Sequence, residues 1–514
     1  MSEAGVLVDA ADYYRAFFHA ARAAKHYIAI AGWQFDSDVC LLRGDEKAQA
    51  GCDTRMLPFL RSLCETNPDL RIYLLAWDFN VLFALEREWM QKLIFNWNSH
   101  PNLKFHFDAS HITWGSHHQK FVVVDGSLGF VGGMDICASR WDDRGHACSE
   151  PNRVEGTRQH GPYHDVQAYL RGAAVQELAR TFEERWATAG APPLTLPQPQ
   201  PVDVKITPTL PMKAHKVALS RTRGRTLTPP QEPVTEIRAL YLRAIEAAEE
   251  HLYIENQYFT SRAIYRALAA RLREPDRKKL EIVFVLPPRA EGMKEQFAHG
   301  LEQAKLLRSL KEIAEEHGHR LGIYYTAAAG EPGEEEKSVY IHSKVLIVDD
   351  RFITIGSANT TNRSMGADTE LNASFETVSG SRFSPLRKSI RQLRLSLLAE
   401  HTGITDGPLY PLLARTEGLV RLLDRLSAGG LHRLREHPLQ TMFDQNEFLK
   451  GLKPDFVWDP ERPLEEDLHE MISSSERNLF TRGIQLLSEF IGTTRGEPVV
   501  VSIPLEEEPR RAPG

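Results

Sequence analysis

A histidine and a lysine separated by one residue occur twice in this chain, each time followed five residues after the lysine by an aspartate. The two copies of this His-x-Lys-x4-Asp pattern are His118, Lys120 and Asp125, and His342, Lys344 and Asp349. The pKa of histidine lies near neutrality, so its side chain can attack phosphorus or transfer a proton. Lysine can hold anionic oxygens as a point charge. Two imidazoles and two ammonium groups brought to one place predict a phosphodiester-cleaving site.

The chemistry divides the six catalytic candidates into roles. One neutral imidazole attacks phosphorus and forms a phosphoryl-histidine, and the other donates a proton to the leaving alcohol. Lys120 and Lys344 neutralise the nonbridging oxygens. For Asp125 and Asp349 we favour a supporting role, orienting the lysine or stabilising the fold, over direct chemistry. Neither half of the chain contains both histidines, so we expect the site at the interface of the two halves.

A turn of small residues follows each motif at the same offset, and its residues are candidates for substrate binding or support. In the first copy the turn contains Gly133 and Asp135, and in the second Ser357 and Asn359. Asn359 is a candidate phosphate donor. Asp135 replaces it in the first copy, which predicts an asymmetric site.

Further polar residues are candidates for support behind the histidines. A carboxylate bonded to the far nitrogen of an imidazole fixes its tautomer and raises its basicity. We assign Glu370 to one histidine and Asp165 to the other. Glu255 and Gln257 follow an apolar run of the second copy, and Trp33 is the equivalent of Gln257 in the first copy. We expect Glu255 and Gln257 to line the pocket, and for Trp33 we give equal weight to lining the pocket and to packing.

The repeat extends beyond the motifs and predicts the fold. Residues 20–35 and 244–259 each read as an Ala-rich helix end that runs into an apolar strand. Apolar runs predict strands at 70–75, 104–107, 121–124, 280–286, 322–325 and 345–348, with helices near 82–97 and 293–317. His118 and Lys120 are expected on a strand, facing the same way. This alternation predicts an α/β protein of two similar lobes, each a mixed, largely parallel sheet flanked by helices.

The expected organisation has four parts. We expect a first lobe at 1–190, a Pro-rich linker at 191–234, a second lobe at 235–400 and a helical C-terminal extension with a tail at 401–514.

Composition sets broad limits on the class of protein. The chain has 514 residues, 42% hydrophobic and 25% charged, which fits a globular protein. A net charge of −7 argues against a protein that coats nucleic acid. The sequence has no apolar run of about 18 residues and no secretory signal pattern at its start. The five cysteines lack metal-ligand spacing and are expected to be reduced thiols. We therefore expect a cytoplasmic monomer, peripheral at the membrane.

The two complete motifs resemble the duplicated signature of the phospholipase D superfamily over about residues 20–400. The segment 253–259, Tyr-Ile-Glu-Asn-Gln-Tyr-Phe, is similar to phospholipases D proper. HHQKFVVVDGSLGFVGGMD and GPYHDVQAYLRG are similar to soluble bacterial phospholipase D-like enzymes. The resemblance implies two α/β lobes, a phosphohistidine intermediate, no required metal or cofactor, and hydrolysis or head-group exchange on a phosphatidyl lipid. It also implies that His118 is the nucleophile and His342 the general acid and base.

Our leading hypothesis is a phospholipase D-type enzyme that acts on phospholipid at a membrane surface, with no nucleic-acid partner. One alternative is a nuclease or another phosphodiesterase on the same scaffold. A second is phosphatidyl transfer of the cardiolipin synthase type, which the lack of N-terminal membrane helices disfavours. The non-enzymatic alternative is an inactive binding scaffold, which would be expected to have lost one of the histidines or lysines.

Overall fold

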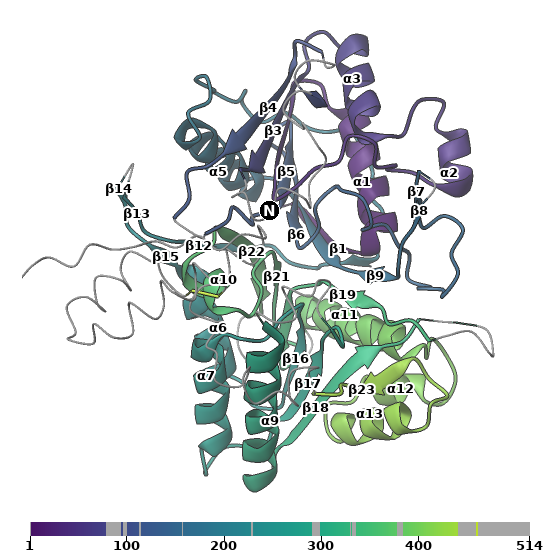
Figure 1. Ribbon diagram of the computed structural model, residues 1–514, viewed down its shortest axis with the longest axis vertical. Helices are drawn as coiled ribbons and strands as arrows, with labels where there is room; N and C mark the ends of the chain where they lie inside the picture. Colours follow the sequence, from purple (N-terminus) through teal and green to yellow (C-terminus); the bar gives the residue numbers. More distant parts are fainter. Residues whose placement is uncertain are drawn as a thin grey trace, which may run out of the picture. The chain divides into compact units, whose positions relative to one another are not determined.

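The computed structural model describes most of the chain up to residue 460 (Figure 1). The described residues are 2–78, 94–95, 100–112, 115–156, 158–227, 230–289, 299–328, 330, 336–377, 384–439 and 459–460. All contacts reported below lie in the compact unit Met1–Pro463. Among the described residues, none of the helices has both the length and the apolar character to cross a membrane.

The first lobe is built on a sheet of eight strands in the order β11-β1-β10-β6-β5-β2-β3-β4. Its strands are β1 (Glu3–Val8), β2 (Tyr27–Gly32), β3 (Arg71–Trp77), β4 (Leu103–Asp108), β5 (Phe121–Val124), β6 (Leu128–Gly132), β10 (Val166–Arg171) and β11 (Leu210–Pro211). Its described helices are α1 (Asp9–Ala23), α2 (Gly44–Gln49), α3 (Met56–Thr66) and α5 (Ala174–Thr188). Asp9 and Asp12 lie in the first turn of α1, where the helix dipole favours negative charge.

The second lobe is built on a sheet of nine strands in the order β15-β12-β22-β21-β20-β16-β17-β18-β23. Its strands are β12 (Ala218–Arg223), β15 (Val234–Thr235), β16 (His251–Glu255), β17 (Glu281–Val285), β18 (Arg320–Thr326), β20 (Val345–Val348), β21 (Phe352–Gly356), β22 (Glu370–Glu376) and β23 (Leu434–Glu436). Its described helices are α6 (Glu236–Glu246), α7 (Arg262–Arg273), α9 (Leu301–Glu316), α10 (Asn362–Gly366), α11 (Pro385–Thr402), α12 (Tyr410–Leu413) and α13 (Leu419–Ala428). Helix α11 begins with a proline and ends before Gly403, whose φ of 73° suits the residue after a helix.

Three short strand pairs complete the described strands. They are β7 (Val154–Glu155) with β8 (Arg158–Gln159), β9 (Tyr163–His164) with β19 (Tyr340–Ile341), and β13 (Thr226–Leu227) with β14 (Pro230–Gln231). The parallel pair β9–β19 joins a strand of the first lobe to a strand of the second. It therefore ties the two lobes together directly beside His342.

The two sheets confirm the predicted duplication of an α/β lobe. The order β10-β6-β5-β2-β3-β4 in the first sheet matches β22-β21-β20-β16-β17-β18 in the second. The expectation of largely parallel sheets is wrong. Only β2–β3, β3–β4, β16–β17 and β17–β18 are parallel among the described pairs of these sheets. The reason is the turn at Asp125-Gly126-Ser127, which returns the chain directly from β5 to β6, and such a short connection joins antiparallel strands.

The Pro-rich segment 191–234 is packed against both lobes rather than solvated along its length. Its strand β11 pairs with β1, and its strand β12 pairs with β22. Leu196, Val202 and Ile206 are buried. The segment thus covers an edge of each sheet, where unpaired backbone groups would otherwise be exposed.

The region after residue 400 contributes more than the predicted helices. Besides α12 and α13 it supplies β23, which pairs antiparallel with β18 at the edge of the second sheet. The helix expected near 293–317 is found as α9, although residues 290–298 are not described. The helix expected near 82–97 falls almost wholly outside the described residues.

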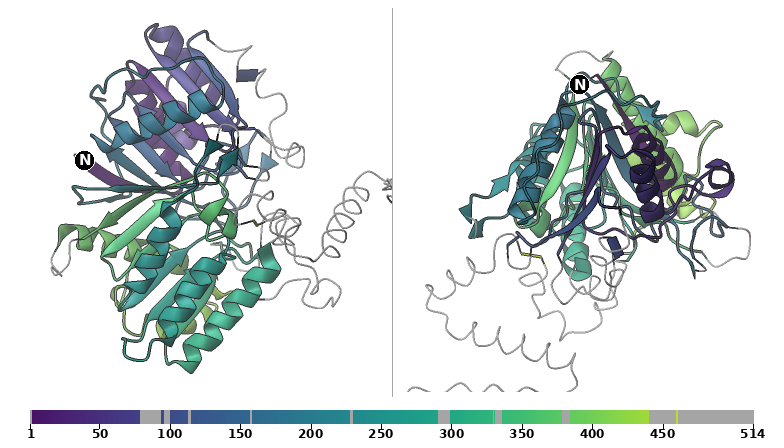
Figure 2. Two further views of the ribbon diagram at one scale, coloured as in Figure 1. Left: turned by 90° about the vertical axis from the view of Figure 1, so that its left-hand side faces the viewer. Right: turned by 90° about the horizontal axis from the view of Figure 1, so that it is seen from above.

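Each lobe has its own apolar core, and a further core is shared by the two lobes (Figure 2 gives two more views of the sheets). The shared core contains Val131 and Val166 from β6 and β10, and Ile355 and Leu371 from β21 and β22. It also takes in side chains of both motif strands, β5 and β20. Burial of these strands on both faces explains their uninterrupted apolar sequences. The shared core holds the two motifs in a fixed relation.

Candidate active site

The His-x-Lys segments lie just before the motif strands rather than on them, which corrects the expectation from the sequence. β5 begins at Phe121 and β20 at Val345. The reason is that the backbone here already pairs with the other lobe. The His118 amide donates to the carbonyl of Thr369 (2.9 Å), and the His342 amide donates to the carbonyl of His164 (2.8 Å). Each motif is therefore held at the interface between the lobes.

Each histidine is bonded by a carboxylate that belongs to the other copy. Nδ1 of His118 lies 3.0 Å from Oε2 of Glu370, and Nδ1 of His342 lies 2.6 Å from Oδ2 of Asp165. Both carboxylates are fully buried. With Nδ1 engaged in this way, Nε2 is the ring nitrogen left for chemistry. The crosswise pairing means that neither lobe contains a complete histidine–carboxylate pair.

The two motif lysines and the two motif histidines act on one another electrostatically. Burial, followed by the charges of Lys120 and Lys344, holds the pKa of His118 well below its usual value. Burial also holds the pKa of His342 well below its usual value, with the charges of Lys344, Arg140, Lys120 and His118 adding to the effect. Burial lowers the pKa of Lys344 to about 7. Burial and the neighbouring positive charges thus favour the neutral form of both imidazoles in the free site.

The two carboxylates respond to burial in the opposite direction. Burial, with the neighbouring charge of Asp368, raises the pKa of Glu370 to about 8. Burial raises the pKa of Asp165 to about 7. A buried carboxylate in contact with an imidazole keeps a proton close to the ring near neutral pH. An arriving phosphate anion would favour the protonated form of either histidine.

The two lysines have different partners. Nζ of Lys120 forms an ion pair with Oδ2 of Asp135 (3.0 Å), and that carboxylate also accepts the Trp33 amide (2.9 Å). Nζ of Lys344 instead donates to the neutral Oε1 of Gln257 (3.2 Å). Nδ2 of Asn359 donates to the same Gln257 oxygen (3.3 Å). The asymmetry expected from Asp135 and Asn359 is present, with the first-copy lysine more fully neutralised.

The small-residue turns make room for the carboxylates. A Cβ atom at Gly133 would collide with the carboxylate of Asp165. At the equivalent position in the second copy, Oγ of Ser357 donates to Oε2 of Glu370 (2.5 Å). The carbonyl of Ser357 lies 3.1 Å from Nδ1 of His118. Gly133 and Ser357 are therefore placed where they position the carboxylates rather than in contact with the reacting phosphate.

Asp125 and Asp349 are not brought to the histidines and lysines. The Asp125 carboxylate accepts the backbone amides of Lys25, His26 and Tyr27 (2.7–2.9 Å). Asp349 accepts those of residues 249–251 in the same way (2.8–2.9 Å). Five residues of extended chain place each aspartate roughly 15 Å beyond its lysine. Of the roles weighed for the two aspartates, stabilising the fold is the one that this geometry supports.

Two further candidates differ from expectation. Glu255 does not line the pocket, because its carboxylate is buried behind the second motif against His164 (3.1 Å), His401 (3.0 Å) and Ser343 (2.6 Å). Trp33 stacks on Trp77 at 5.6 Å between ring centroids, which is the packing role considered for it. Gln257, in contrast, does lie in the site, bonded to Lys344.

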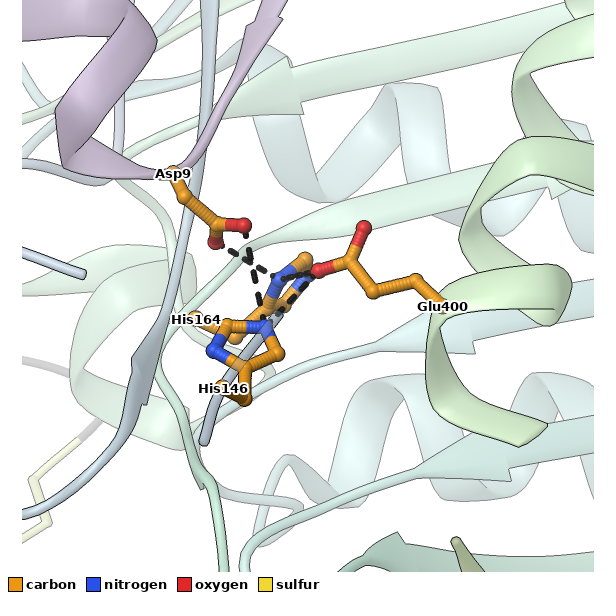
Figure 3. A group of neighbouring side chains, drawn as sticks. All are labelled: Asp9, His146, His164 and Glu400. Carbon is orange, nitrogen blue, oxygen red and sulfur yellow. Dashed lines mark hydrogen bonds and ion pairs between the residues drawn. The ribbon is translucent and has the colours of Figure 1, made fainter. Parts of the chain in front are cut away.

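A cluster of four buried ligand-type residues lies behind the His342 side of the site (Figure 3). Asp9, His146, His164 and Glu400 are fully or almost fully buried, and one ligand atom of each lies within 4.8 Å of the others. Oε1 of Glu400 is 2.8 Å from Nδ1 of His164 and 2.9 Å from Nε2 of His146. Oδ2 of Asp9 is 3.6 Å from Nε2 of His146. A divalent cation with bonds of about 2.1 Å needs ligand atoms about 3.4 Å apart, so the 2.8 and 2.9 Å contacts would have to widen for this set to hold one.

The side chains that bond the two histidines from outside the cluster are arranged as they would be around a bound cation. Nδ1 of His146 is bonded by Asp142 (2.8 Å), and Nε2 of His164 by Glu255 (3.1 Å), which leaves the other ring nitrogens facing the cluster. Carboxylates commonly orient metal-binding histidines in this way. The Asp9 amide donates to the carbonyl of Asp165 (2.8 Å), so the cluster supports the carboxylate that holds His342. Sequence spacing does not indicate this cluster, because Asp9 and Glu400 lie far along the chain from His146 and His164.

The fold and the site define a duplicated α/β protein with two histidine–lysine pairs at the interface of its lobes. Comparison with known families assigns residues 96–222 to a family described as phospholipase D, and residues 241–384 to one described as cardiolipin synthase, PLD-like domain. The chain belongs to the phospholipase D superfamily and carries two phospholipase D domains.

Similar proteins of known sequence include phospholipases D of plants. Phospholipase D alpha 1 of Ricinus communis is 26% identical and that of Arabidopsis thaliana 25%, each over 76% of this chain and 63% of the relative. The chain thus spans slightly less than two thirds of their length. Among solved structures, phosphatidylserine synthase of Haemophilus influenzae is 14% identical with a TM-score of 0.49, covering 83% of this chain and 93% of that one. The phospholipase D family member Nuc of Salmonella typhimurium is 17% identical with a TM-score of 0.24, covering 36% of this chain and 93% of that one.

Proposed function

We propose that this protein is a phospholipase D-type phosphodiesterase that converts glycerophospholipids to phosphatidic acid or transfers the phosphatidyl group to an alcohol. The observation that carries the proposal is the crosswise pairing of His118 with Glu370 and His342 with Asp165. Two imidazoles oriented by buried carboxylates, with two lysines whose charges act on both rings, supply a nucleophile, a proton donor and charge neutralisation. These are the functions that cleavage of an anionic diester requires.

The first half of the reaction breaks the bond to the head group. Nε2 of His118 attacks phosphorus and forms a P–N bond, while the bond from phosphorus to the head-group oxygen breaks. His342 gives its Nε2 proton to that oxygen, so the head group leaves as an alcohol rather than as an alkoxide. Lys120 and Lys344 hold the nonbridging oxygens, whose charge is retained throughout. The negative charge of the bound diester favours the protonated form of His342 that this step needs.

The second half releases the product and regenerates the site. Nε2 of His342 takes a proton from water, and the water oxygen attacks phosphorus as the P–N bond to His118 breaks. The product is phosphatidic acid. If a primary alcohol takes the place of water, the product is a phosphatidyl alcohol. Asn359 and Gln257 lie beside Lys344 and are the further donors that could contact the phosphate.

A vesicle assay tests the proposal. Purified full-length protein is incubated with phosphatidylcholine, phosphatidylethanolamine or phosphatidylglycerol vesicles, with and without a primary alcohol, and single-stranded DNA is assayed in parallel. The expected result is release of phosphatidic acid and, with the alcohol, of a phosphatidyl-alcohol product. Cleavage of DNA with inert lipids would replace the proposal with a nuclease. Loss of both activities would contradict it in favour of a binding scaffold.

A further inference from the structure

The two sides of the site differ in the groups that surround each histidine. Next to His342 lie the rings of Tyr163, with centroids 5.4 Å apart, and of Tyr340, at 6.4 Å. The two tyrosines lie 5.6 Å from each other on the strand pair β9–β19, so both lobes fix their positions. The guanidinium carbon of Arg140 lies 4.9 Å from the centroid of the Tyr163 ring. The three side chains and His342 form one contiguous group, in which the ring planes are tilted by 30–33° to one another.

This group of side chains is partly exposed and is held in place by hydrogen bonds. Tyr163 is buried, whereas Arg140 and Tyr340 are half-buried. Nε2 of Gln257 donates to the hydroxyl of Tyr340 (2.8 Å), and the carbonyl oxygen of the same amide accepts from Lys344. The phosphate-binding lysine and the tyrosine pair are therefore linked through one side chain. A molecule bound to Lys344 through its phosphate would place its next atoms beside Tyr340 and Arg140.

The charge around the two histidines is also unequal. Asp135 and Asp368 act on the pKa of His118 against the neighbouring lysines. The charged groups that most affect the pKa of His342, after burial, are Lys344, Arg140, Lys120 and His118, and all of them lower it. Arg140 thus adds positive charge beside His342 that has no counterpart among the groups acting most strongly on His118.

We propose that Arg140, Tyr163 and Tyr340 form the subsite for the alcohol portion of the diester, and that they select an alcohol carrying a carboxylate over one carrying a quaternary ammonium. The inference rests on the proposed function with His118 as nucleophile. Attacking and leaving groups lie roughly in line in phosphoryl transfer, so the alcohol departs on the His342 side. A guanidinium binds a carboxylate with two parallel hydrogen bonds. The same guanidinium already stacks on the Tyr163 ring that a quaternary ammonium would otherwise use, and it repels that cation.

A binding experiment tests the subsite without turnover. In the His118→Ala background, calorimetry compares sn-glycero-3-phosphoserine with sn-glycero-3-phosphocholine. We expect the phosphoserine diester to bind about 10- to 100-fold more tightly, the range of a charge-assisted hydrogen bond. Arg140→Gln should reduce this ratio to about one. The matched control is Arg22→Gln, which changes another arginine stacked on a ring, Phe18, on the outer side of α1, and it should leave the ratio unchanged.

Each outcome bears on the inference. Equal, reversed or undetectable binding of the phosphoserine diester overturns it, as does a ratio that survives Arg140→Gln. A parallel arm measures kcat/KM of the wild type on phosphatidylserine and phosphatidylcholine vesicles. A binding preference without cleavage of either lipid contradicts the proposed function and leaves the subsite in place. Cleavage of both lipids at equal kcat/KM, with equal binding, contradicts the subsite alone.

Discussion

His118 and His342 occupy equivalent positions in two copies of one lobe, yet their surroundings differ. Both rings are fixed through Nδ1 by a carboxylate of the other lobe. Behind His118, the carboxylate is anchored by Ser357 and Ser364. Behind His342, the Asp165 carboxylate accepts the Val166 amide, and the backbone of Asp165 is bonded to Asp9, a member of the charged cluster. The two copies therefore share the same order of strands. The residues around the two histidines differ, so the two sides of the site are not equivalent.

The motif lysines repeat this contrast. Lys120 is paired with the charged Asp135, and Lys344 with the neutral Gln257. Lys344, the lysine without this carboxylate partner, belongs to the same motif as His342. The proposed mechanism releases and accepts the alcohol on that side. A symmetric fold can thus support an ordered reaction, because the difference between nucleophile and acid lies in the contacts of each copy rather than in its strands.

Removing either imidazole should have the largest effect on activity. The loss should be equally severe for the two histidines. We expect His118→Ala and His342→Ala each to lower the kcat/KM of lipid hydrolysis by at least about 10³-fold, since nucleophile and proton donor act as a unit. His111→Ala should retain activity, because the ring contacts of His111 are with Trp77 and His117 rather than with His118 or His342. Robust turnover by either alanine variant would refute the two-histidine mechanism.

The crosswise carboxylates should come next. Asp165→Asn and Glu370→Gln remove the charge but keep the shape, and each should lower kcat by about 10- to 100-fold, the range seen when a partner that orients a histidine is lost. Double-mutant kinetics sharpen the comparison. Asp165→Asn should cost little once His342 is alanine, yet should keep its full effect when Glu370 is glutamine. If Asp165→Asn were equally non-additive with His342→Ala and with Glu370→Gln, the crosswise pairing would be contradicted.

The motif aspartates should affect stability on both sides alike. Asp125→Ala and Asp349→Ala each leave three backbone amides without their carboxylate, which should lower the free energy of unfolding by about 2–4 kcal/mol. Urea denaturation measures the loss, and the specific activity of the folded fraction should stay within a few-fold of wild type. A folded variant with activity as low as that of His118→Ala would place the aspartate in the chemistry.

The cluster behind His342 predicts the smallest effect, and one confined to that side. If Asp9, His146, His164 and Glu400 hold a divalent cation, removing it with a chelator should lower Tm by several degrees, the equivalent of about 2–3 kcal/mol of binding energy. Readdition of the cation should restore Tm, and Glu400→Gln should abolish the response. Elemental analysis of the purified protein gives the stoichiometry. A Tm that is insensitive to chelation, with no metal found, would show that the cluster is held by ion pairs alone.

The sequence was informative wherever a local pattern reflects a local structure. Uninterrupted apolar runs located β5 and β20, and the matched offsets of the motifs and turns revealed the duplication. The direction of the strands was missed, although Asp125-Gly126 between two apolar runs is a hairpin signal that favours antiparallel pairing. The role of each motif aspartate depends on which backbone it reaches across the lobe, about 100 residues away in the chain, and spacing alone does not show this.

Long-range arrangements were the least accessible from sequence. The pairing of Glu370 with His118 rather than His342 depends on how the two sheets pack, which is set by the shared core. Asp9 and Glu400 lie near opposite ends of the described chain, and their meeting with His164 has no counterpart in sequence spacing. Glu255 was placed in the pocket because it ends a strand, but on this strand it faces away from the phosphate site, toward His164 and His401.

The central claim is that two imidazoles from separate lobes act on one phosphorus atom, one of them covalently. The most direct test is rapid quenching with a phospholipid labelled at phosphorus, followed by mass spectrometry of the labelled peptide. The account predicts a phosphohistidine at His118 in the wild type. In His342→Ala it should accumulate when the leaving group, such as p-nitrophenol, departs without a proton, because hydrolysis of the P–N bond is slowed, and it should be absent from His118→Ala. Label on any other residue, or full turnover with no label on His118, would contradict it.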